Sequence, residues 1–252
     1  IGTGIPSHGK SNFTDWYILN LIKDYKLKAS WFSPEHMPLE LYQTNLAEKV
    51  IGKNFWKEKD GVPRISKKEL DQYKEWANEK MYFTTAEKGY APTWKWLVEK
   101  FKEQMYSFGI DVFVIDAFNK VILPRGNKLD TINDVLTKLT SFSQANNVMI
   151  FLIAHPTKMG KDENGKNEVP TLYHVSGSSD FRNQTHNGYT IHRHFGDPDN
   201  ELDEDYTEFW NMKTKFNFQG NIGDRIQFKY CDINGRYYAC LLYTSDAADD
   251  GV

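Results

Sequence analysis

The sequence predicts an α/β fold in which a mostly parallel central sheet is flanked by helices. Two short runs, residues 110–116 and 148–154, are almost continuously apolar, which is typical of strands that are buried on both faces. Segments with a helical spacing of apolar side chains lie next to them, at residues 93–108 and 131–146. Strands that alternate with helices favour parallel pairing through right-handed crossovers.

The other helices are expected where apolar residues recur every three or four positions, at residues 11–26, 38–50 and 66–80. The last of these has the spacing of a capping box at its start, with Ser66 and Glu69 three residues apart. Between the second and third helix, residues 52–66 form a basic loop that contains Gly and Pro.

The other strands are expected in short apolar or β-branched runs, at residues 1–3, 27–33, 81–85, 189–194, 208–215 and 225–230. Residues 1–3 are too few for a whole strand, so we expect the natural chain to continue upstream. The last two strands are expected to pair antiparallel across a turn at residues 220–223.

Composition predicts one large domain over residues 1–239. With 252 residues, of which 40% are hydrophobic, the chain can bury one sizeable core. No apolar run reaches about 18 residues and no signal-peptide pattern is visible, so we expect no membrane partner and an intracellular location. Cys231 and Cys240 lack the second Cys/His pair of a zinc site and form no disulfide framework.

Residues 240–252 differ from the rest of the chain, because they are small or acidic and contain no Lys or Arg. They resemble a translated sequencing-library adapter, and we exclude them from the expected fold. Without Asp246, Asp249 and Asp250 the net charge of −3 becomes zero. A neutral domain has no global electrostatic signature of a nucleic-acid-binding protein, so any such contact must be local.

The sequence begins with the spacing of a phosphate-binding loop, G-x-x-x-x-G-K-S. Such a loop directs successive N–H groups at phosphate oxygens, which requires glycine where a Cβ would collide or φ is positive. Lys10 would face the β- and γ-phosphates, Ser11 would bind Mg²⁺, and the following helix would add its N-terminal dipole. A glycine-rich turn that only caps a helix is the alternative. The residues predicted to bind nucleotide are Gly4, Ser7, His8, Gly9, Lys10, Ser11 and Asn12.

Hydrolysis of a nucleoside triphosphate also requires a held Mg²⁺ and an oriented water. Asp116 ends a predicted central strand and is expected on the Mg²⁺ side, as in a Walker B segment. It is followed by Ala117 and Phe118 rather than by a second carboxylate. The general base must therefore come from elsewhere, and Glu35, just after the second predicted strand, is the candidate. An exposed glutamate before a helix is the alternative interpretation.

His155 follows the strand that comes after Asp116 in the chain. Because the carboxyl ends of parallel strands share one edge of a sheet, we expect His155 to face the γ-phosphate and to report hydrolysis. A purely structural histidine is the alternative.

The ordered motifs resemble those of the ring-forming RecA-like replicative helicases, the family that includes DnaB, the mitochondrial helicase Twinkle and phage primase-helicases. Besides the phosphate loop and Asp116, three segments carry the resemblance. Residues 32–37 are similar to the family's Ser-Leu-Glu-Met, residues 154–158 to the His-Pro-Arg-Lys of the Twinkle branch, and residues 175–179 to a Ser-Gly-Ser segment before a DNA-facing helix. The resemblance spans about residues 1–230.

The resemblance implies a RecA-like ATPase that uses ATP and Mg²⁺, forms a hexameric ring and moves 5′ to 3′ on single-stranded DNA. In the family a neighbouring subunit supplies a basic pair, Lys-x-Arg-Phe, to each nucleotide. Here Lys213 and Lys215 match that pair, with lysine at the finger position, which keeps the charge but loses the planar fork of arginine. Arg225 is the fallback.

Further properties follow from the resemblance alone. The implied DNA contacts are Lys158, Lys161, Lys166 and Asn183. Relatives with the His-Pro motif often carry an N-terminal Toprim primase on the same polypeptide, and their setting is the cytoplasm of a bacterial or phage-infected cell.

Two other functions remain open from the sequence. A recombinase or ATP-switch protein would use the same core to hold a filament on DNA. A small-molecule kinase would use the same phosphate loop, but no Arg-rich lid segment is present.

Overall fold

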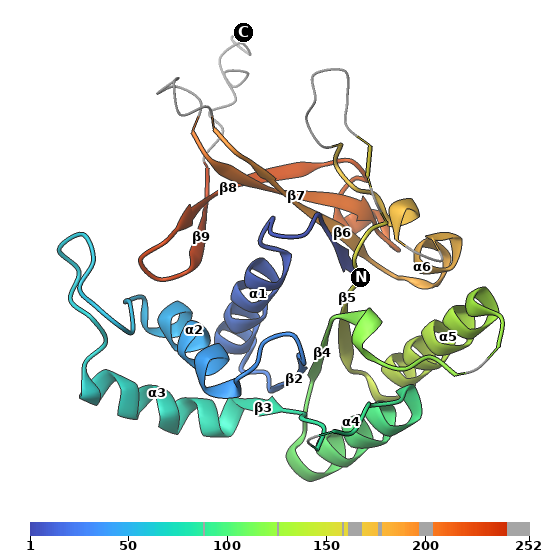
Figure 1. Cartoon of the computed structure of the whole chain (residues 1–252), viewed down its shortest axis with the longest axis horizontal. Helices are drawn as coiled ribbons and strands as arrows, with labels where there is room; N and C mark the ends of the chain where they lie inside the picture. The colour runs from blue at the N-terminus through green and yellow to red at the C-terminus, as the bar shows by residue number, and fades with distance from the viewer. Residues whose placement is uncertain are drawn as a thin grey trace, which may run out of the picture.

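The computed structural model describes residues 1–87, 89–124, 126–157, 159–160, 168–175, 178–196 and 204–240. Within this part of the chain, nine strands form one sheet in the order β3-β2-β4-β5-β1-β6-β7-β8-β9 (Figure 1). The strands from β3 to β6 pair in parallel, and β7, β8 and β9 pair antiparallel. The predicted mostly parallel α/β fold, with antiparallel strands near the C-terminus, is confirmed.

The parallel strands are β1 Gly2–Thr3, β2 Ala29–Phe32, β3 Met81–Phe83, β4 Val112–Asp116, β5 Met149–Ile153 and β6 Gly188–His194. The antiparallel strands are β7 Tyr206–Lys213, β8 Arg225–Cys231 and β9 Arg236–Ala239. The two-residue β1 lies in the middle of the sheet, between β5 and β6.

Helices cover both faces of the parallel strands. They are α1 Lys10–Tyr25, α2 Leu39–Ile51, α3 Lys67–Lys80, α4 Trp94–Phe108, α5 Lys128–Asn146 and α6 Ser178–Gln184. In Figure 1, α1, α2 and α3 lie on one side of the sheet and α4 and α5 on the other. Alternate residues of β4 join the two resulting cores, since Val112 and Val114 pack with α1 and α2 while Phe113 and Ile115 pack with α4 and α5.

Most predicted elements appear within a few residues of their expected bounds. The capping box is present, because the Ser66 hydroxyl accepts from Glu69 N and the Glu69 carboxylate accepts from Ser66 N. Helix α5 begins at residue 128 instead of 131, since the Asn127 side chain accepts from Leu129 N and caps the helix earlier.

Strand β9 was not predicted. It pairs with β8 across a tight turn that contains Asn234 and Gly235, a dipeptide typical of hairpins. None of the described helices combines the length and apolar character needed to cross a membrane.

Candidate active site

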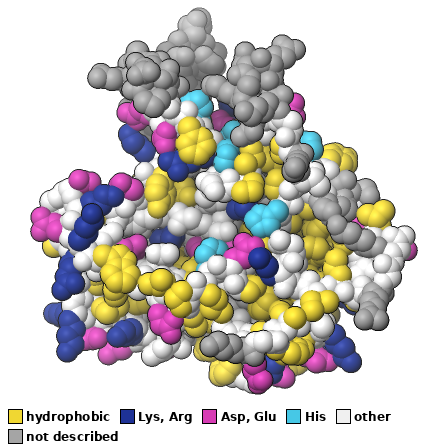
Figure 2. All heavy atoms as spheres, viewed as in Figure 1, with side chains coloured by type: hydrophobic (Ala, Val, Ile, Leu, Met, Phe, Trp, Pro, Cys, Tyr) yellow, Lys and Arg dark blue, Asp and Glu magenta, His cyan; other side chains and the backbone are white. Residues whose placement is uncertain are grey.

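The carboxyl ends of four parallel strands meet at one edge of the sheet. In the register, Phe32 of β2 lies opposite Ile115, Asp116 lies opposite Ile153 of β5, and Gly2 of β1 also lies opposite Ile153. The residues that follow these strands, Glu35, His155 and the phosphate loop, are therefore brought to the same edge as Asp116. Figure 2 shows histidine, acidic and basic side chains gathered near the centre of the face drawn there.

The phosphate loop runs from Gly4 into α1, which begins at Lys10. Glycine is required at both ends of the loop. A Cβ on Gly4 would lie 2.5 Å from Ile191 O, and Gly9 has a φ of 83° and would place a Cβ 2.9 Å from the Tyr237 hydroxyl. Ser7 also has a positive φ, 68°, which is uncommon for a residue with a side chain. The loop thus presents the N-terminus of α1 with its unpaired N–H groups, a favourable place for phosphate.

Asp116 is almost completely buried, with 3% of its surface exposed. Its Oδ1 is buried and has no hydrogen-bond partner among the described residues. Burial raises the pKa of the carboxyl, while the Ser11 hydroxyl and the positive charges of His36 and Lys10 act in the opposite direction. An unpartnered carboxylate oxygen beside a serine hydroxyl and a buried lysine fits an oxygen-ligand cation such as Mg²⁺.

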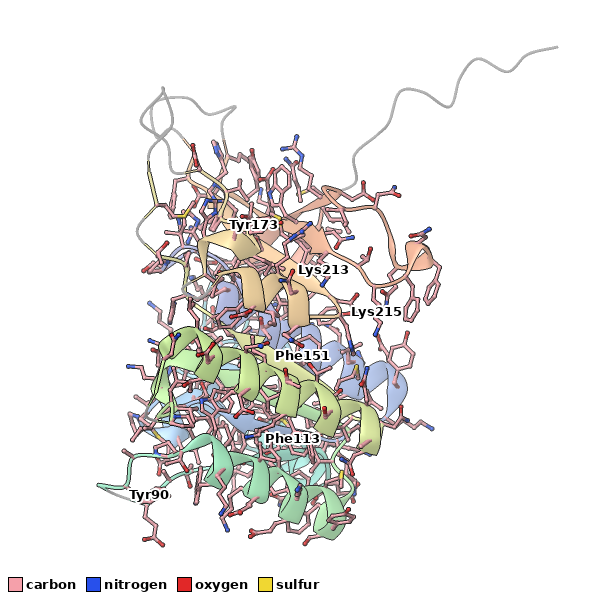
Figure 3. The ribbon with its side chains drawn as sticks, turned by 90° about the vertical axis from the view of Figure 1, so that its right-hand side faces the viewer. Tyr90, Phe113, Phe151, Tyr173, Lys213 and Lys215 are labelled. Carbon is pink, nitrogen blue, oxygen red and sulfur yellow. The ribbon has the colours of Figure 1, made fainter. Side chains whose placement is uncertain are left out.

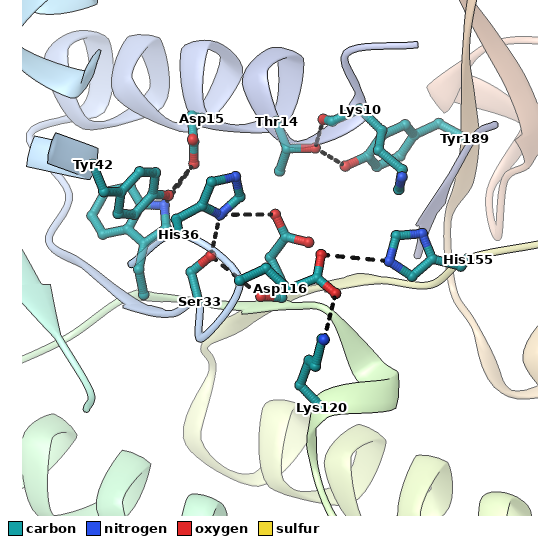
Figure 4. A network of polar contacts seen from close by, with 12 residues as sticks. Lys10, Thr14, Asp15, Ser33, His36, Tyr42, Asp116, Lys120, His155 and Tyr189 are labelled. Carbon is teal, nitrogen blue, oxygen red and sulfur yellow. Dashed lines mark hydrogen bonds and ion pairs between the residues drawn. The ribbon is translucent and has the colours of Figure 1, made fainter. Parts of the chain in front are cut away.

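Lys10 is buried in the same place. Burial lowers the pKa of its ammonium, and the nearby Asp116 and Glu35 carboxylates raise it. In Figure 4 the Lys10 side chain extends from the start of α1 toward the space beside Asp116 and His155. A cation held between two carboxylates is available to polyphosphate, which offers several negative oxygens at once.

Glu35 forms two ion-pair contacts. Its Oε2 lies 3.6 Å from His155 Nε2, and its Oε1 lies 3.4 Å from Lys120 Nζ. Burial lowers the pKa of His155, an effect that Lys10 reinforces, so the imidazole is neutral at pH 7. Its Nδ1 is buried and has no partner among the described residues. Because Glu35 only accepts, the single N–H of this neutral ring belongs on Nε2.

Sequence reasoning assigned no role to Ser33 and His36, which also reach this edge. The Ser33 hydroxyl donates to Asp116 O at 3.2 Å, and His36 Nδ1 lies 2.6 Å from the same hydroxyl. Since serine has one proton to give, His36 Nδ1 is the donor in the second bond. His36 Nδ1 is also 3.9 Å from Asp116 Oδ2. Its position next to Glu35 in the sequence was the signal that could have identified it.

Asp15 was missed as well. It lies buried on α1, and its Oδ1 accepts from Trp31 Nε1 at 3.0 Å and from the Tyr42 hydroxyl at 2.8 Å. The His36 ring stacks on Tyr42 with 4.8 Å between ring centroids, which joins this cluster to the site. Burial raises the pKa of Asp15 to about 6, against the opposing effect of Lys49.

Asp15→Asn is expected to change how stability depends on pH. The folded-state pKa of about 6 lies above the ordinary value of 3.8, so the contribution of Asp15 is fully present below pH 3.8 and is lost as the pH rises through 6. Asparagine keeps the Oδ1 acceptor but cannot titrate. From pH 5 to 7.5 the free energy of unfolding of the variant should rise by about 1 kcal/mol relative to the wild type, measured by urea denaturation. Parallel pH profiles for the two proteins would contradict the assignment.

The predicted basic residues of the late strands lie away from the phosphate loop. Lys213 Nζ donates to Arg182 O at 2.5 Å and to Asn183 O at 3.3 Å, and Lys215 is exposed just beyond β7 (Figure 3). Arg225 Nη1 lies 3.2 Å from Glu208 Oε1. No contact between these residues and the loop is recorded within the described part of the chain.

The other predicted site residues have separate positions. The Asn12 amide donates to Gly235 O and to the Tyr237 hydroxyl, so it joins α1 to the β8–β9 hairpin. Asn183 is exposed on α6. The predicted DNA contacts Lys158, Lys161 and Lys166 lie outside the described residues.

An apolar cavity of about 760 Å³ lies at the opposite edge of the sheet, between α1 and α5. It is lined by residues that include Leu21, Leu139 and Met149. Among the predicted site residues that the structure describes, only Lys213 lines it. The polar site at the carboxyl edge is therefore the candidate for chemistry.

Comparison with known proteins gives one sequence relative. No protein-family model matches the chain. The chain is similar to the Twinkle homolog protein, chloroplastic/mitochondrial, of Arabidopsis thaliana, with 31% identity over 227 residues. The match covers 88% of this chain and 31% of the relative, so the chain spans about a third of the length of the curated relative it matches.

Two solved structures share the fold, each at 14% sequence identity and over 94% of this chain. One is a DnaB-like replicative helicase, studied with its interactions with primase, with a TM-score of 0.72 over 56% of that chain. The other is the ATPase domain of a second protein, with a TM-score of 0.70 over 82% of that chain. At this level of identity the two structures establish the fold.

Proposed function

We infer that the chain belongs to the DnaB- and Twinkle-like helicases as their RecA-like ATPase domain, and on that premise we propose that it hydrolyses ATP to move along single-stranded DNA. The observation that carries the proposal is the convergence of Lys10, Glu35, Asp116 and His155 at the carboxyl edge of the sheet, beside the phosphate loop (Figure 4).

In the proposed mechanism the phosphates of ATP lie against the loop N–H groups and the Lys10 ammonium. Ser11 and Asp116 would hold Mg²⁺, the latter through its unpartnered Oδ1. The ion neutralises negative charge on the phosphates when bound. Glu35 accepts a proton from the attacking water, and its position one strand away from the loop leaves space for that water.

His155 is proposed to sense the γ-phosphate. Its neutral ring directs Nε2 toward Glu35 at 3.6 Å, which is too long for a firm hydrogen bond. A γ-phosphate oxygen is a stronger acceptor within the same space. When ATP binds, the N–H of His155 would turn to that oxygen and free Glu35 to orient water, and hydrolysis would reverse the change.

We propose that each nucleotide lies between two subunits of a ring and that Lys215 of one subunit acts on the nucleotide of the next, with Lys213 beside it. Lys215 is exposed, and the loop that follows it carries exposed apolar side chains, with Phe216 51%, Phe218 85% and Ile222 58% exposed. Exposed aromatic groups of this kind mark protein interfaces. Arg225 remains the alternative finger, although Glu208 already pairs with it.

The remaining parts of the proposal rest on the family alone. They are DNA contacts through Lys158, Lys161, Lys166 and Asn183, movement from 5′ to 3′, a hexameric ring, a primase on the same polypeptide, an ATPase domain over residues 1–239, and a cytoplasmic setting in a bacterial or phage-infected cell.

The proposal is tested by measuring ATP hydrolysis by the purified protein with and without single-stranded DNA, and by unwinding of forked duplexes with either a 5′ or a 3′ tail. A helicase should be stimulated by DNA and should unwind only from the tail of one polarity. A filament-forming recombinase would bind DNA and hydrolyse ATP without unwinding, and a kinase would transfer the phosphoryl group to a small molecule.

Mixing two inactive variants tests the intersubunit site. Lys215→Ala subunits keep the phosphate loop, and Lys10→Ala subunits keep the finger. At a 1:1 ratio about one quarter of the interfaces in a head-to-tail ring would unite both intact parts and should recover ATP hydrolysis. Lys215→Arg, which retains the charge and adds the planar fork, should hydrolyse ATP at least as fast as the wild type. Absence of recovery at every mixing ratio would argue against Lys215.

A further inference from the structure

His8 belongs to the phosphate loop, yet its ring is directed at strand β6 and not outward. The side chain is 5% exposed, and its Nδ1 accepts a hydrogen bond from Arg193 N at 2.9 Å. The Arg193 guanidinium is engaged elsewhere, with Asp205 and over the Phe195 ring. The contact therefore joins the loop side chain to the backbone of β6.

The backbone of β6 needs this partner. Strand β1 ends at Thr3, which lies opposite Thr190, three residues before Arg193. Beyond that point β1 offers no carbonyl to β6, and the His8 ring takes the place of the missing acceptor. Removing it would leave a backbone N–H without a partner in a largely buried position.

The surroundings keep His8 in the form that accepts. The rings of His192 and Phe195 lie 4.9 and 5.5 Å from the His8 ring. Burial lowers the pKa of His8 to about 4, and the positive charges of His192, Arg193 and Lys10 act in the same direction. The ring is therefore neutral at pH 7, and Nδ1 can accept from Arg193 N.

The contact acts on the least favourable part of the loop. Ser7, directly before His8, has a φ of 68°, a conformation that costs energy in a residue with a Cβ. The ends of the loop are fixed separately, because Gly4 packs on Ile191 O and Gly9 packs on the Tyr237 hydroxyl. His8 is the anchor of the middle.

We propose that His8 is a positioning residue for nucleotide binding, whose Nδ1 holds the phosphate loop against β6 in the shape that receives phosphates before the nucleotide arrives. The proposal rests on the proposed function, since it assumes that the loop binds ATP or ADP. A loop that is already ordered loses less conformational entropy on binding, so the anchor raises affinity without touching the ligand.

Asparagine and leucine at position 8 make a matched pair, because they branch alike and only asparagine has an acceptor at the δ position. Binding of a fluorescent ADP analogue to the full-length protein should weaken about tenfold in His8→Leu, the scale expected for one lost hydrogen bond, and should stay within about threefold in His8→Asn. Thermal unfolding without nucleotide compares the stability of the two variants. Rescue by asparagine separates the anchor from simple filling of the space.

Equal affinity of His8→Leu and the wild type would overturn the proposal, as would equal weakening in both variants. Should His8→Leu fail to fold, hydrogen exchange of the Arg193 amide in the wild type without nucleotide decides the question, because the anchor requires slow exchange and fast exchange contradicts it. A wild-type protein that binds no nucleotide would instead refute the proposed function.

Discussion

Glu35→Gln is expected to reduce ATP hydrolysis by about 10²- to 10⁴-fold and to leave ATP affinity within a few-fold of the wild type. Glutamine keeps the size of the side chain and its carbonyl oxygen but cannot take a proton from water. Binding depends mainly on the loop N–H groups and Lys10, and loss of a negative charge near the γ-phosphate cannot weaken it. The measurements are single-turnover hydrolysis and titration with a fluorescent ATP analogue.

Glu40→Gln is the matched control, since it makes the same chemical change five residues later, in the first turn of α2. It should hydrolyse ATP at the wild-type rate. Near-normal turnover in Glu35→Gln would show that another group activates water. The next group to test would then be His155, which lies 3.6 Å from Glu35.

The edge of the sheet that carries the candidate site was predictable because strand ends are local signals. Asp116 and His155 each follow a short apolar run, and parallel pairing of those runs brings their ends together without further information. The phosphate loop was predictable for a similar reason, since its glycines occupy places where a Cβ would collide. Such constraints depend on the backbone alone.

Contacts between side chains from distant segments were not predictable in this way. Asp15 and Tyr42 are 27 residues apart and meet only because α1 and α2 pack on the same face of the sheet. His8 occupies a variable position of the loop pattern, so nothing in the pattern indicates that its ring turns to β6. Strand β9 escaped prediction for a different reason, because its four residues lie next to the atypical tail although Asn234-Gly235 signals the turn.

Lys10→Ala is expected to weaken ADP and ATP binding by about 10- to 100-fold and to abolish hydrolysis, because charge-assisted hydrogen bonds to phosphate are among the strongest polar contacts. The loss has a second cause in the free protein. The Lys10 ammonium counteracts the burial that raises the pKa of Asp116. Without it this pKa rises further, and a protonated Asp116 is a poor partner for a cation.

Lys120→Ala separates these effects from a general loss of positive charge. Lys120 Nζ lies 3.4 Å from Glu35 Oε1 but is part of neither the loop nor the contacts of Asp116. Its removal should leave nucleotide affinity within a few-fold of the wild type. Raising Mg²⁺ should restore part of the affinity lost in Lys10→Ala, because the cation competes with the proton for Asp116. Equal losses in both variants, or no response to Mg²⁺, would mean that Lys10 contributes only to the overall charge of the site.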